Sequence, residues 1–286
     1  MNPYCKLVAA AAAVVTEGRS LPLGGFPSAP RAEINADAPK ALFFSPHPDD
    51  ETIAGGLALR LMREAKWNII NVAVTQGSLE ERKAPRLEEL RAACDYLGFG
   101  LETTVPGGLD DVRPATRAKD PEAWSHKVEI IAGLLEKHQP KLVFCPHQLD
   151  WNQTHIGTHL LVIDALKLAK NIRCDVVETE FWGQMQSPNL MVEYSASDLS
   201  DLVAATSFHV GEVKRNPYHL LLPAWMQDNV RRGAELVGGQ GGAAPTFMFA
   251  QVFRAQKWDG ADLQHYYAGG RFLSESVNAG TFFPKP

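Results

Sequence analysis

The sequence predicts an α/β fold in which a mostly parallel sheet is covered by helices on both faces. Between positions 41 and 182, short apolar runs alternate with segments whose apolar residues recur at helical spacing. Continuous apolar runs are typical of strands buried on both faces, and helices of ten to fifteen residues between them indicate right-handed crossover connections. Polar and ionisable residues follow several of these runs, where sites form in parallel sheets.

Six segments have the character of strands. Three of them, ALFFSPH, NIINVAVTQG and KLVFCPH, are rich in apolar residues. Weaker or mixed patterns are found in ETTVPGG, DVVETEFWG and FMFAQVFRAQKW. We therefore expect strands at residues 41–47, 68–77, 102–108, 141–147, 175–183 and 247–258.

Six other segments are predicted to be helices. In the first helix of the alternating region, Ile53, Leu57 and Leu61 fall on one side, which is the pattern of an amphipathic helix. The helix that begins at Arg86 is expected to stop at Gly98, because glycine is common just after a helix. The expected helices are residues 3–17, 51–64, 86–97, 121–138, 155–169 and 216–237.

We expect one large domain behind an N-terminal extension. Residues 1–40 are predicted to form an alanine-rich helix and a loop that wraps onto the domain. The single domain spans residues 40–286, with the motifs in residues 40–183 and an elaboration of the sheet in residues 184–286. The segment KLVAAAAAVV is similar to the core of a secretory signal, but no small-x-small cleavage site follows it, so a helix is preferred.

Composition narrows the range of partners. The net charge of −5 and a pI near 6.0, without a basic stripe, argue against nucleic acid. No apolar run reaches the ~20 residues needed to cross a bilayer. The four cysteines are scattered and form no Cys-x-x-Cys pair, which indicates a reducing, cytoplasmic setting. A small-molecule substrate is the expected partner, and a homo-oligomer is left open.

Polar residues stand where the predicted strands end. Because parallel strands end at the same edge of a sheet, these segments are expected to converge on one site although they are far apart in the sequence. The segments are residues 47–51, 75–77, 146–155 and 178–182.

The run His-Pro-Asp-Asp-Glu at residues 47–51 has two interpretations. In the first, the acids only open a helix, whose macrodipole favours carboxylates in the first turn. That interpretation leaves His47 unexplained. In the second, His47 and Asp50 bind a metal ion with His155 as third ligand, because two histidines and a carboxylate are a common catalytic zinc set. Asp49 is then free to act as the base.

The same run, placed after an apolar strand, resembles the signature of the LmbE-like N-acetylglucosaminyl deacetylases, the PIG-L family. Further matches follow in the family's order: Thr-Gln-Gly at residues 75–77, Arg-x-x-Glu-Leu starting at Arg86, Leu-Gly at residues 97–98, and Asp-x-Asn-x-Thr-His at residues 150–155. The resemblance covers residues 40–183 well and the C-terminal third only loosely.

The resemblance implies a Rossmann-like fold that binds one zinc ion per chain. By motif position, the zinc ligands are His47, Asp50 and His155, and Asp49 is the general base. Arg86 is implied to contact the substrate. The implied reaction hydrolyses the acetamide of an N-acetylated amino sugar or its conjugate with a metal-activated water, which yields acetate and a free amine.

One position departs from the family's pattern. Many members have a histidine three residues before the last ligand, where this chain has Asn152. An asparagine amide can donate a hydrogen bond to an oxyanion, but it cannot transfer a proton. Either Asn152 only donates a hydrogen bond to the oxyanion, or His147 or His159 takes the place of the family's histidine. His159, four residues after His155, is also a candidate substrate contact, and Glu51 is expected to steady the ligand turn by hydrogen bonds.

Two other functions are open: a phosphoesterase with paired metal ions, and a sugar-binding protein on the same scaffold that performs no reaction. The sequence has few further carboxylates for a second metal, and a binding protein needs no base beside the ligands. Trp151 and Trp182 are candidates for stacking on a sugar ring. Ordinary core or surface roles are preferred for the remaining candidates, which are Asp110, Asp111, Cys145, Glu180, His209, His219 and His265.

Overall fold

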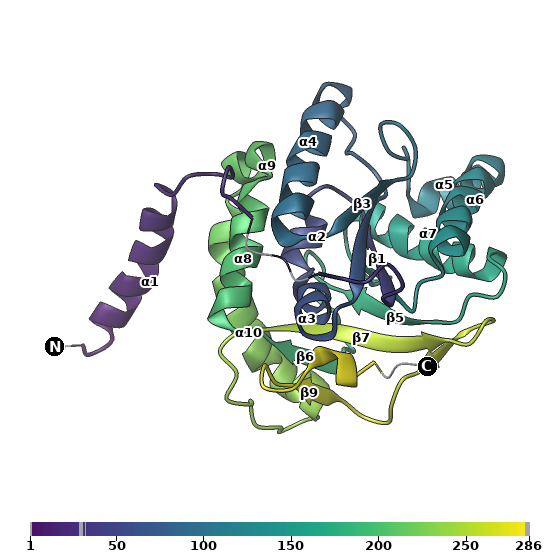
Figure 1. The fold of residues 1–286 in the computed structure, drawn as a ribbon. Helices are drawn as coiled ribbons and strands as arrows, with labels where there is room; N and C mark the ends of the chain where they lie inside the picture. The colour runs from purple at the N-terminus through teal and green to yellow at the C-terminus, as the bar shows by residue number, and fades with distance from the viewer. Residues whose placement is uncertain (1, 29–30, 32, 284–286) are drawn as a thin grey trace.

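Within the residues that the structure describes, a nine-stranded mixed sheet lies between two layers of helices (Figure 1). The computed structural model describes residues 2–28, 31 and 33–283. The strand order is β3-β2-β1-β4-β5-β7-β6-β9, and β8 pairs with β7. The strands are β1 (Lys40–Ser45), β2 (Asn68–Ala73), β3 (Gly100–Thr103), β4 (Leu142–Pro146), β5 (Cys174–Thr179), β6 (Leu190–Glu193), β7 (Ala250–Trp258), β8 (Leu263–His265) and β9 (Arg271–Leu273).

The helices connect these strands and cover the sheet (Figure 1). On one face lie α3, α4, α8 and α10, and on the other lie α6 and α7. The helices are α1 (Cys5–Gly18), α2 (Asp50–Ile53), α3 (Gly56–Ala65), α4 (Glu80–Leu97), α5 (Pro114–Lys119), α6 (Pro121–His138), α7 (Gln153–Leu168), α8 (Ala196–Ser207), α9 (Val210–Arg215), α10 (Tyr218–Gly238) and the 3-10 turn η1 (Ala279–Thr281).

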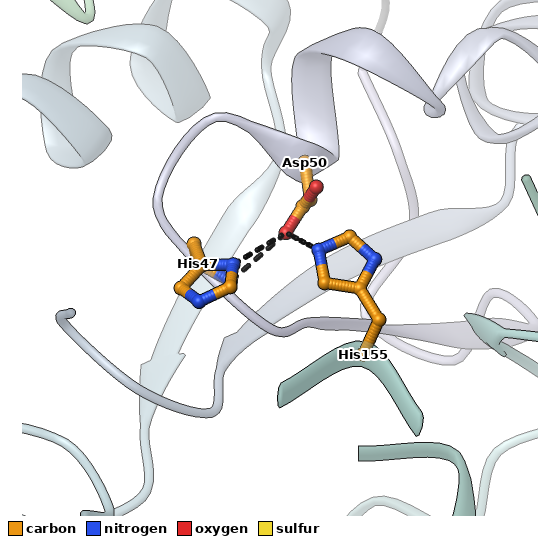
Figure 2. Close-up of side chains that lie close together, drawn as sticks. All are labelled: His47, Asp50 and His155. Atoms are coloured by element: carbon orange, nitrogen blue, oxygen red, sulfur yellow. Dashed lines mark hydrogen bonds and ion pairs between the residues drawn. The ribbon is translucent and has the colours of Figure 1, made fainter. Parts of the chain in front are cut away.

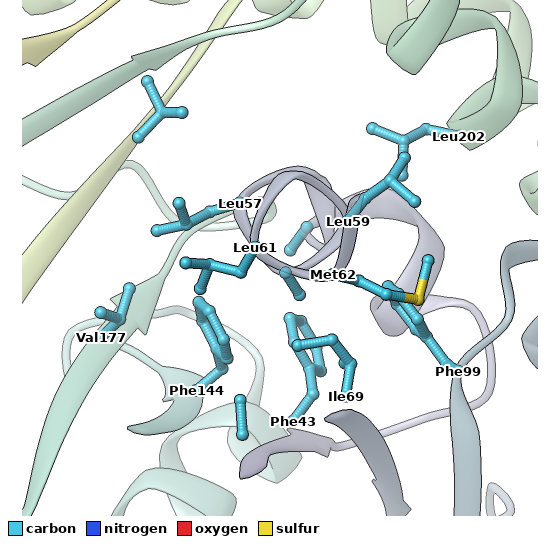
Figure 3. Close-up of a cluster of buried hydrophobic side chains, with 14 of the residues drawn as sticks. Phe43, Leu57, Leu59, Leu61, Met62, Ile69, Phe99, Phe144, Val177 and Leu202 are labelled. Carbon is cyan, nitrogen blue, oxygen red and sulfur yellow. The ribbon is translucent and has the colours of Figure 1, made fainter. Parts of the chain in front are cut away.

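The apolar run of β1 explains the two layers. Phe43 belongs to the core under α3, whereas its neighbour Phe44 belongs to the core under α6 and α7, because successive side chains of a strand point to opposite faces. Figure 3 shows Leu61 of α3 above Phe144 of β4, whose ring stacks on Phe43 with centroids 5.3 Å apart. Burial of each such side chain contributes about 1.5–3 kcal/mol to the free energy of folding. This well-packed part of the sheet supports the loops that follow its strands.

The strand order creates a crevice beside β1. Strands β3, β2, β1, β4 and β5 are parallel, and β1 pairs with β2 on one side and with β4 on the other. The chain therefore leaves β1 and β4 in opposite directions, which is the topological switch point where open α/β sheets bind ligands. The predicted mostly parallel sheet with helices on both faces is confirmed, and β7 adds antiparallel pairs with β5 and β6.

Several predicted elements are shorter than expected or divided; the strands expected over residues 68–77 and 175–183 end at Ala73 and Thr179. The single helix expected over residues 51–64 is wrong: α2 ends at Ile53, and α3 begins only at Gly56. The chain bends at Gly55, where an added Cβ would lie 2.0 Å from the carbonyl oxygen of Glu51. The strand expected over residues 102–108 ends at Thr103, because a turn through two glycines with positive φ follows it.

The C-terminal third holds elements that the sequence patterns did not reveal, namely β6, α8, α9, β8 and β9. They extend the sheet beyond β7 and cover the face that carries α3 and α4. Helix α1 stands apart from the main body in Figure 1 and contacts α10 near its C-terminal end. Among the described residues, no helix combines the length and the apolar character that crossing a membrane requires.

Candidate metal centre

Three predicted ligands meet at the carboxyl ends of β1 and β4. Figure 2 shows the side chains of His47, Asp50 and His155 turned toward one another. Oδ2 of Asp50 lies 3.6 Å from Nδ1 of His47 and 3.4 Å from Nε2 of His155. One ligand atom from each residue lies within 4.8 Å of the other two. Two imidazoles and a carboxylate at these separations can hold one divalent cation and leave a coordination position open.

Local hydrogen bonds hold these ligands in place. The backbone N–H of His47 donates to Oδ2 of Asp50 at 2.9 Å, which fixes the turn between β1 and α2. On the other side, Asn152 caps α7, because its Oδ1 accepts from the backbone N–H groups of Thr154 and His155 at 2.9 and 3.4 Å. The cap places His155 in the first turn of α7, directed at the end of β1.

Asp150 stands behind His155. Its Oδ2 lies 3.5 Å from Nδ1 of His155, and its carboxylate accepts from the backbone N–H groups of Asn152 and Gly183 at 2.8 and 3.3 Å. A carboxylate on the far nitrogen orients a ligating histidine and leaves Nε2 for the metal. The sequence interpretation gave Asp150 no role, although the spacing Asp-x-Asn-x-Thr-His contained it.

The charges around His155 favour a cation. Burial opposes protonation of His155, but the combined attraction of Asp50 and Asp150 outweighs it and raises its pKa. The pKa of His47 is lowered, chiefly because the ring is buried. Within the described residues, Nε2 of His155 is buried and has no hydrogen-bond partner. Such a buried polar atom, facing a carboxylate and a neutral imidazole, fits a metal ligand.

Asp49 adopts an unusual backbone conformation beside the ligands. Its φ is 125°, a value that residues other than glycine rarely adopt. Its N–H donates to Oε2 of Glu51 at 3.0 Å, and Oε1 of Glu51 lies 2.7 Å from Nε2 of His209. Glu51 and His209 are both fully buried. The pKa of Asp49 is raised well above its ordinary value, because burial disfavours its charge and Asp50 repels it.

A polar cavity of about 230 Å³ opens beside the cluster. His47, Asp49 and Asn152 line one part of it, so the candidate ligand, base and oxyanion donor face a common space. Trp182 and Tyr218 form an aromatic wall, with ring centroids 5.3 Å apart. The other lining residues are Gln76, Gly77, Ser78, Leu79, Arg82, Arg86, Glu212 and Arg215.

Arg86 reaches this cavity through a gap that glycine provides. Its Nη2 donates to the carbonyl oxygen of Pro48 at 3.0 Å, so the guanidinium also supports the ligand turn. An added Cβ at Gly77 would lie 2.4 Å from Nη1 of Arg86, and the φ of Gly77 is 88°. A side chain at position 77 would therefore push the guanidinium out of its place.

The structure does not bring His147 and His159 to the cavity. Nε2 of His147 donates to the carbonyl oxygen of Gly183 at 2.8 Å. Nδ1 of His159 donates to the carbonyl oxygen of Pro146 at 3.0 Å, and burial lowers the pKa of His159 to about 4. The side chain of His159 turns under the end of β4 and does not line the cavity, so its contact with a substrate stays a prediction.

Other candidates also lie outside the cavity. Cys145 is buried in the core on the α6–α7 side of the sheet. Asp110 and Asp111, in the turn after β3, are exposed to solvent. Trp151 is 67% exposed and touches the cavity only through Trp182. Glu180 is paired with Arg232 instead. A larger cavity, about 1060 Å³, lies between α10 and residues 242–248 and contains none of the predicted site residues.

The sequence interpretation missed the contribution of α9 and the residues before it. His209, Glu212 and Arg215 all lie in the C-terminal third and reach the site from the side. His209 is 158 positions from its partner Glu51. Neither spacing nor hydropathy marks such pairs, and only the fold brings them together.

Comparisons with known proteins give a family match, a curated relative and solved structures of the same fold. Residues 42–166 match the family model described as PIG-L: GlcNAc-PI de-N-acetylase. Over 90 residues, the chain is 37% identical to the 1D-myo-inositol 2-acetamido-2-deoxy-alpha-D-glucopyranoside deacetylase of Segniliparus rotundus. That match covers 31% of this chain and 28% of the relative, so the chain spans little more than a quarter of the curated relative's length.

Two solved structures share the fold at low identity. The N,N'-diacetylchitobiose deacetylase of Pyrococcus horikoshii is 17% identical with a TM-score of 0.53, over 78% of this chain and 85% of that one. The 4-carboxy-2-hydroxymuconate hydratase GalB of Pseudomonas putida is 18% identical with a TM-score of 0.56, over 76% and 95%. A hydratase and a deacetylase thus share this architecture, and the fold alone does not name a reaction.

Proposed function

Because residues 42–166 of this chain match the family model described as PIG-L: GlcNAc-PI de-N-acetylase, we propose that the protein is a metal-dependent hydrolase that removes the acetyl group from an N-acetylated amino sugar or its conjugate. One observation carries the proposal: the family match spans the whole candidate site on the β1 and β4 side, rather than the scaffold alone. The residues inside it are His47, Asp49, Asp50, Asn152 and His155.

We propose that His47, Asp50 and His155 hold one zinc ion per chain. Two histidines and a carboxylate suit zinc, and the buried Nε2 of His155 has no other partner among the described residues. Such an ion supplies Lewis acidity, which polarises a carbonyl and makes a nearby water more acidic. Asp150 keeps the His155 ring oriented through Nδ1.

The protein's own residues then carry the proton and the developing charge. In this proposal Asp49 accepts a proton from the attacking water and delivers it to the nitrogen of the leaving amine. Burial and the repulsion of Asp50 raise the pKa of Asp49, which is the direction expected for a group that returns a proton after accepting it. Oδ1 of Asn152 is occupied by the helix cap, so its Nδ2 is the atom available to donate to the oxyanion.

The alternative functions receive less support. Paired metal ions would favour a phosphoesterase, but within the described residues His47, Asp50 and His155 form the one cluster of three suitable ligands. A protein that only binds a sugar has no use for Asp49 in its strained conformation next to the ligands. A cytoplasmic location belongs to the same proposal, supported by four cysteines that are all free.

The proposal is tested with a panel of N-acetylated sugars and sugar conjugates, scored by release of a free amine. We expect turnover of at least one compound, loss of turnover after chelation, and its return on adding zinc. Asp49→Asn should keep about one zinc per chain and lose at least about 100-fold in kcat, because general acid–base catalysis contributes about 10²–10⁴-fold.

Asp110→Asn is the matched control, because Asp110 is an exposed acid outside the cavity. Full activity in Asp49→Asn would remove that residue as the base. A panel with no amine release from zinc-loaded protein would count against the deacetylase.

A further inference from the structure

Three arginines surround one carboxylate in the cavity wall. Nη2 of Arg82, on α4, lies 2.7 Å from Oε1 of Glu212, on α9. Nε of Arg86 lies 3.8 Å from the same oxygen, and Nη2 of Arg215 contacts the second oxygen. All four residues line the cavity that also contains Asp49, so this arginine cluster (Arg82, Arg86 and Arg215) shares one space with the candidate base.

Glu212 alone does not satisfy the arginine cluster. Each guanidinium carries five N–H donors, whereas one carboxylate offers about four acceptor positions. Burial opposes ionisation of Glu212, but Arg86, Arg215 and Arg82 outweigh it and lower its pKa, so the carboxylate is charged. Asp49 is the second acid in the cavity wall. Even with both acids counted as charged, the three guanidinium groups outnumber them, so the wall keeps an excess of positive charge and of donors.

Unpaired buried atoms point to a ligand in the same place. Gln76 lines the cavity and is 1% exposed, yet neither its Oε1 nor its Nε2 has a hydrogen-bond partner in the described part of the chain. Nε of Arg86 is also buried without a partner there. Buried polar groups are satisfied in nearly all proteins. A molecule with acceptor oxygens for Arg86 and a hydroxyl group, which can both donate to Oε1 and accept from Nε2 of Gln76, would complete them.

From these observations we propose that the arginine cluster binds a negatively charged group, a carboxylate or a phosphate, that the N-acetylated substrate carries. The inference rests on the proposed deacetylase function and narrows its substrate class to anionic sugars or sugar conjugates. Guanidinium groups suit both anions, because their N–H donors match the spacing of carboxylate and phosphate oxygens. The Gln76 amide contacts a polar group of the same molecule.

A purely structural role would explain part of the cluster. Arg82 and Arg86 connect α4 to α9 through Glu212, and such a link could exist only to hold α9 in place. Arg215 is different, because its side chain is 64% exposed and its partner Glu212 lies three residues earlier on the same helix. A pair within one helical turn connects no other element, so Arg215 is the residue on which the two explanations differ.

The test compares Arg215→Gln with the wild-type protein on three substrates. They are N-acetylglucosamine, its 6-phosphate, and N-acetylmuramic acid, which carries a carboxylate; kcat/KM is measured for each with zinc-loaded protein. We expect wild type to prefer at least one charged sugar, and Arg215→Gln to lower that kcat/KM about tenfold through the loss of one charge-assisted contact. The ratio of this kcat/KM to that for N-acetylglucosamine should fall in the variant, and the two charged sugars separate phosphate from carboxylate recognition.

Arg231→Gln is the matched control. Arg231 is also exposed, pairs with an acid three residues earlier, and lies on α10 outside this cavity. An equal loss on all three sugars, or no loss on any, would overturn the anion site. If no sugar is hydrolysed, the deacetylase proposal fails, and titration calorimetry of N-acetylglucosamine 6-phosphate still decides: equal affinity of wild type and Arg215→Gln would reject the anion site.

Discussion

A buried ion pair supports the residue proposed as the base. Glu51 accepts the backbone N–H of Asp49 with one oxygen and faces His209 with the other. Burial lowers the pKa of His209, but the attraction of Glu51 and other nearby acids raises it overall, so the pair is charged. The expectation that Glu51 steadies the ligand turn gains a physical basis in these two contacts. His209 acts through Glu51 as a positioning residue.

We predict that His209→Leu lowers the free energy of unfolding by about 3 kcal/mol, because it leaves the Glu51 carboxylate buried without its partner. Urea unfolding at pH 7 measures this loss. His219→Leu is a matched control: His219 is also buried, and burial alone shifts its pKa. In the double variant His209→Leu with Glu51→Gln, much of the lost stability should return. Equal effects of the two histidine substitutions would contradict the ion pair.

At the scale of elements, α7 joins the site to the sheet. Its first turn carries His155, and one turn later His159 reaches under β4 to the carbonyl oxygen of Pro146. Burial holds the pKa of His159 at about 4, below its ordinary 6.5. The unfolded chain therefore binds a proton between pH 6.5 and 4 that the folded protein does not bind, so stability falls as pH falls through this window.

We predict that His159→Gln reduces this pH dependence. Between pH 7 and pH 5, the free energy of unfolding of the wild-type protein should fall by about 2 kcal/mol more than that of the variant, since one pKa unit equals about 1.4 kcal/mol. Urea unfolding of both proteins at the two pH values gives the difference. The other titrating or charged groups near this ring are His147, Asp164, Glu178 and Arg254. Glu178 lies 3.3 Å from Nδ1 of His159 and burial raises its pKa to about 7, so both proteins are compared in a Glu178→Gln background. Parallel pH profiles would contradict the burial of a neutral His159.

The elements that were predicted correctly are those whose signal is local. The buried run in β1 and the glycine after α4 are visible in the sequence, and β1 lies where expected. Helix α4 ends at Leu97 as expected but begins at Glu80 rather than Arg86, with Pro85 inside it. The break between α2 and α3 depends on tertiary contacts, since Gly56 must fit against the ring of Tyr194. Short elements such as α9, with six residues, have too little periodicity to be recognised.

At the scale of the whole molecule, the ligands connect segments that are far apart in the sequence. His47 and Asp50 follow β1, whereas His155 belongs to α7 beyond β4. A metal ion bound to all three should stabilise the folded state by mass action. With zinc at about 1,000 times its Kd, the gain is about 4 kcal/mol, which raises Tm by about 10 °C in a protein of this size.

Thermal unfolding with and without zinc checks this prediction, and elemental analysis gives the metal content. His155→Ala should unfold at the same temperature in both conditions and should purify without stoichiometric zinc. A zinc-dependent rise in Tm that survives in His155→Ala would place the metal on other residues.

The sequence allowed the residues on one side of the site to be predicted, but not those on the other side. The residues from His47 to Glu51 and from Asp150 to His155 lie in two short motifs, and the structure brings their ligands together as expected. The opposite wall comes from Glu212 and Arg215, whose function depends on the way α9 packs beside α4. Packing between distant helices leaves no local pattern, so the features that would select a substrate were invisible.

The backbone at Asp49 has a consequence for anyone who engineers this protein. Its φ of 125° is a conformation that glycine adopts freely and aspartate does not. Selection of a variant library for thermal stability alone should therefore enrich glycine at position 49. The same substitution would remove the proposed base. Screens for robustness and for turnover would rank the variants of this one residue in opposite orders.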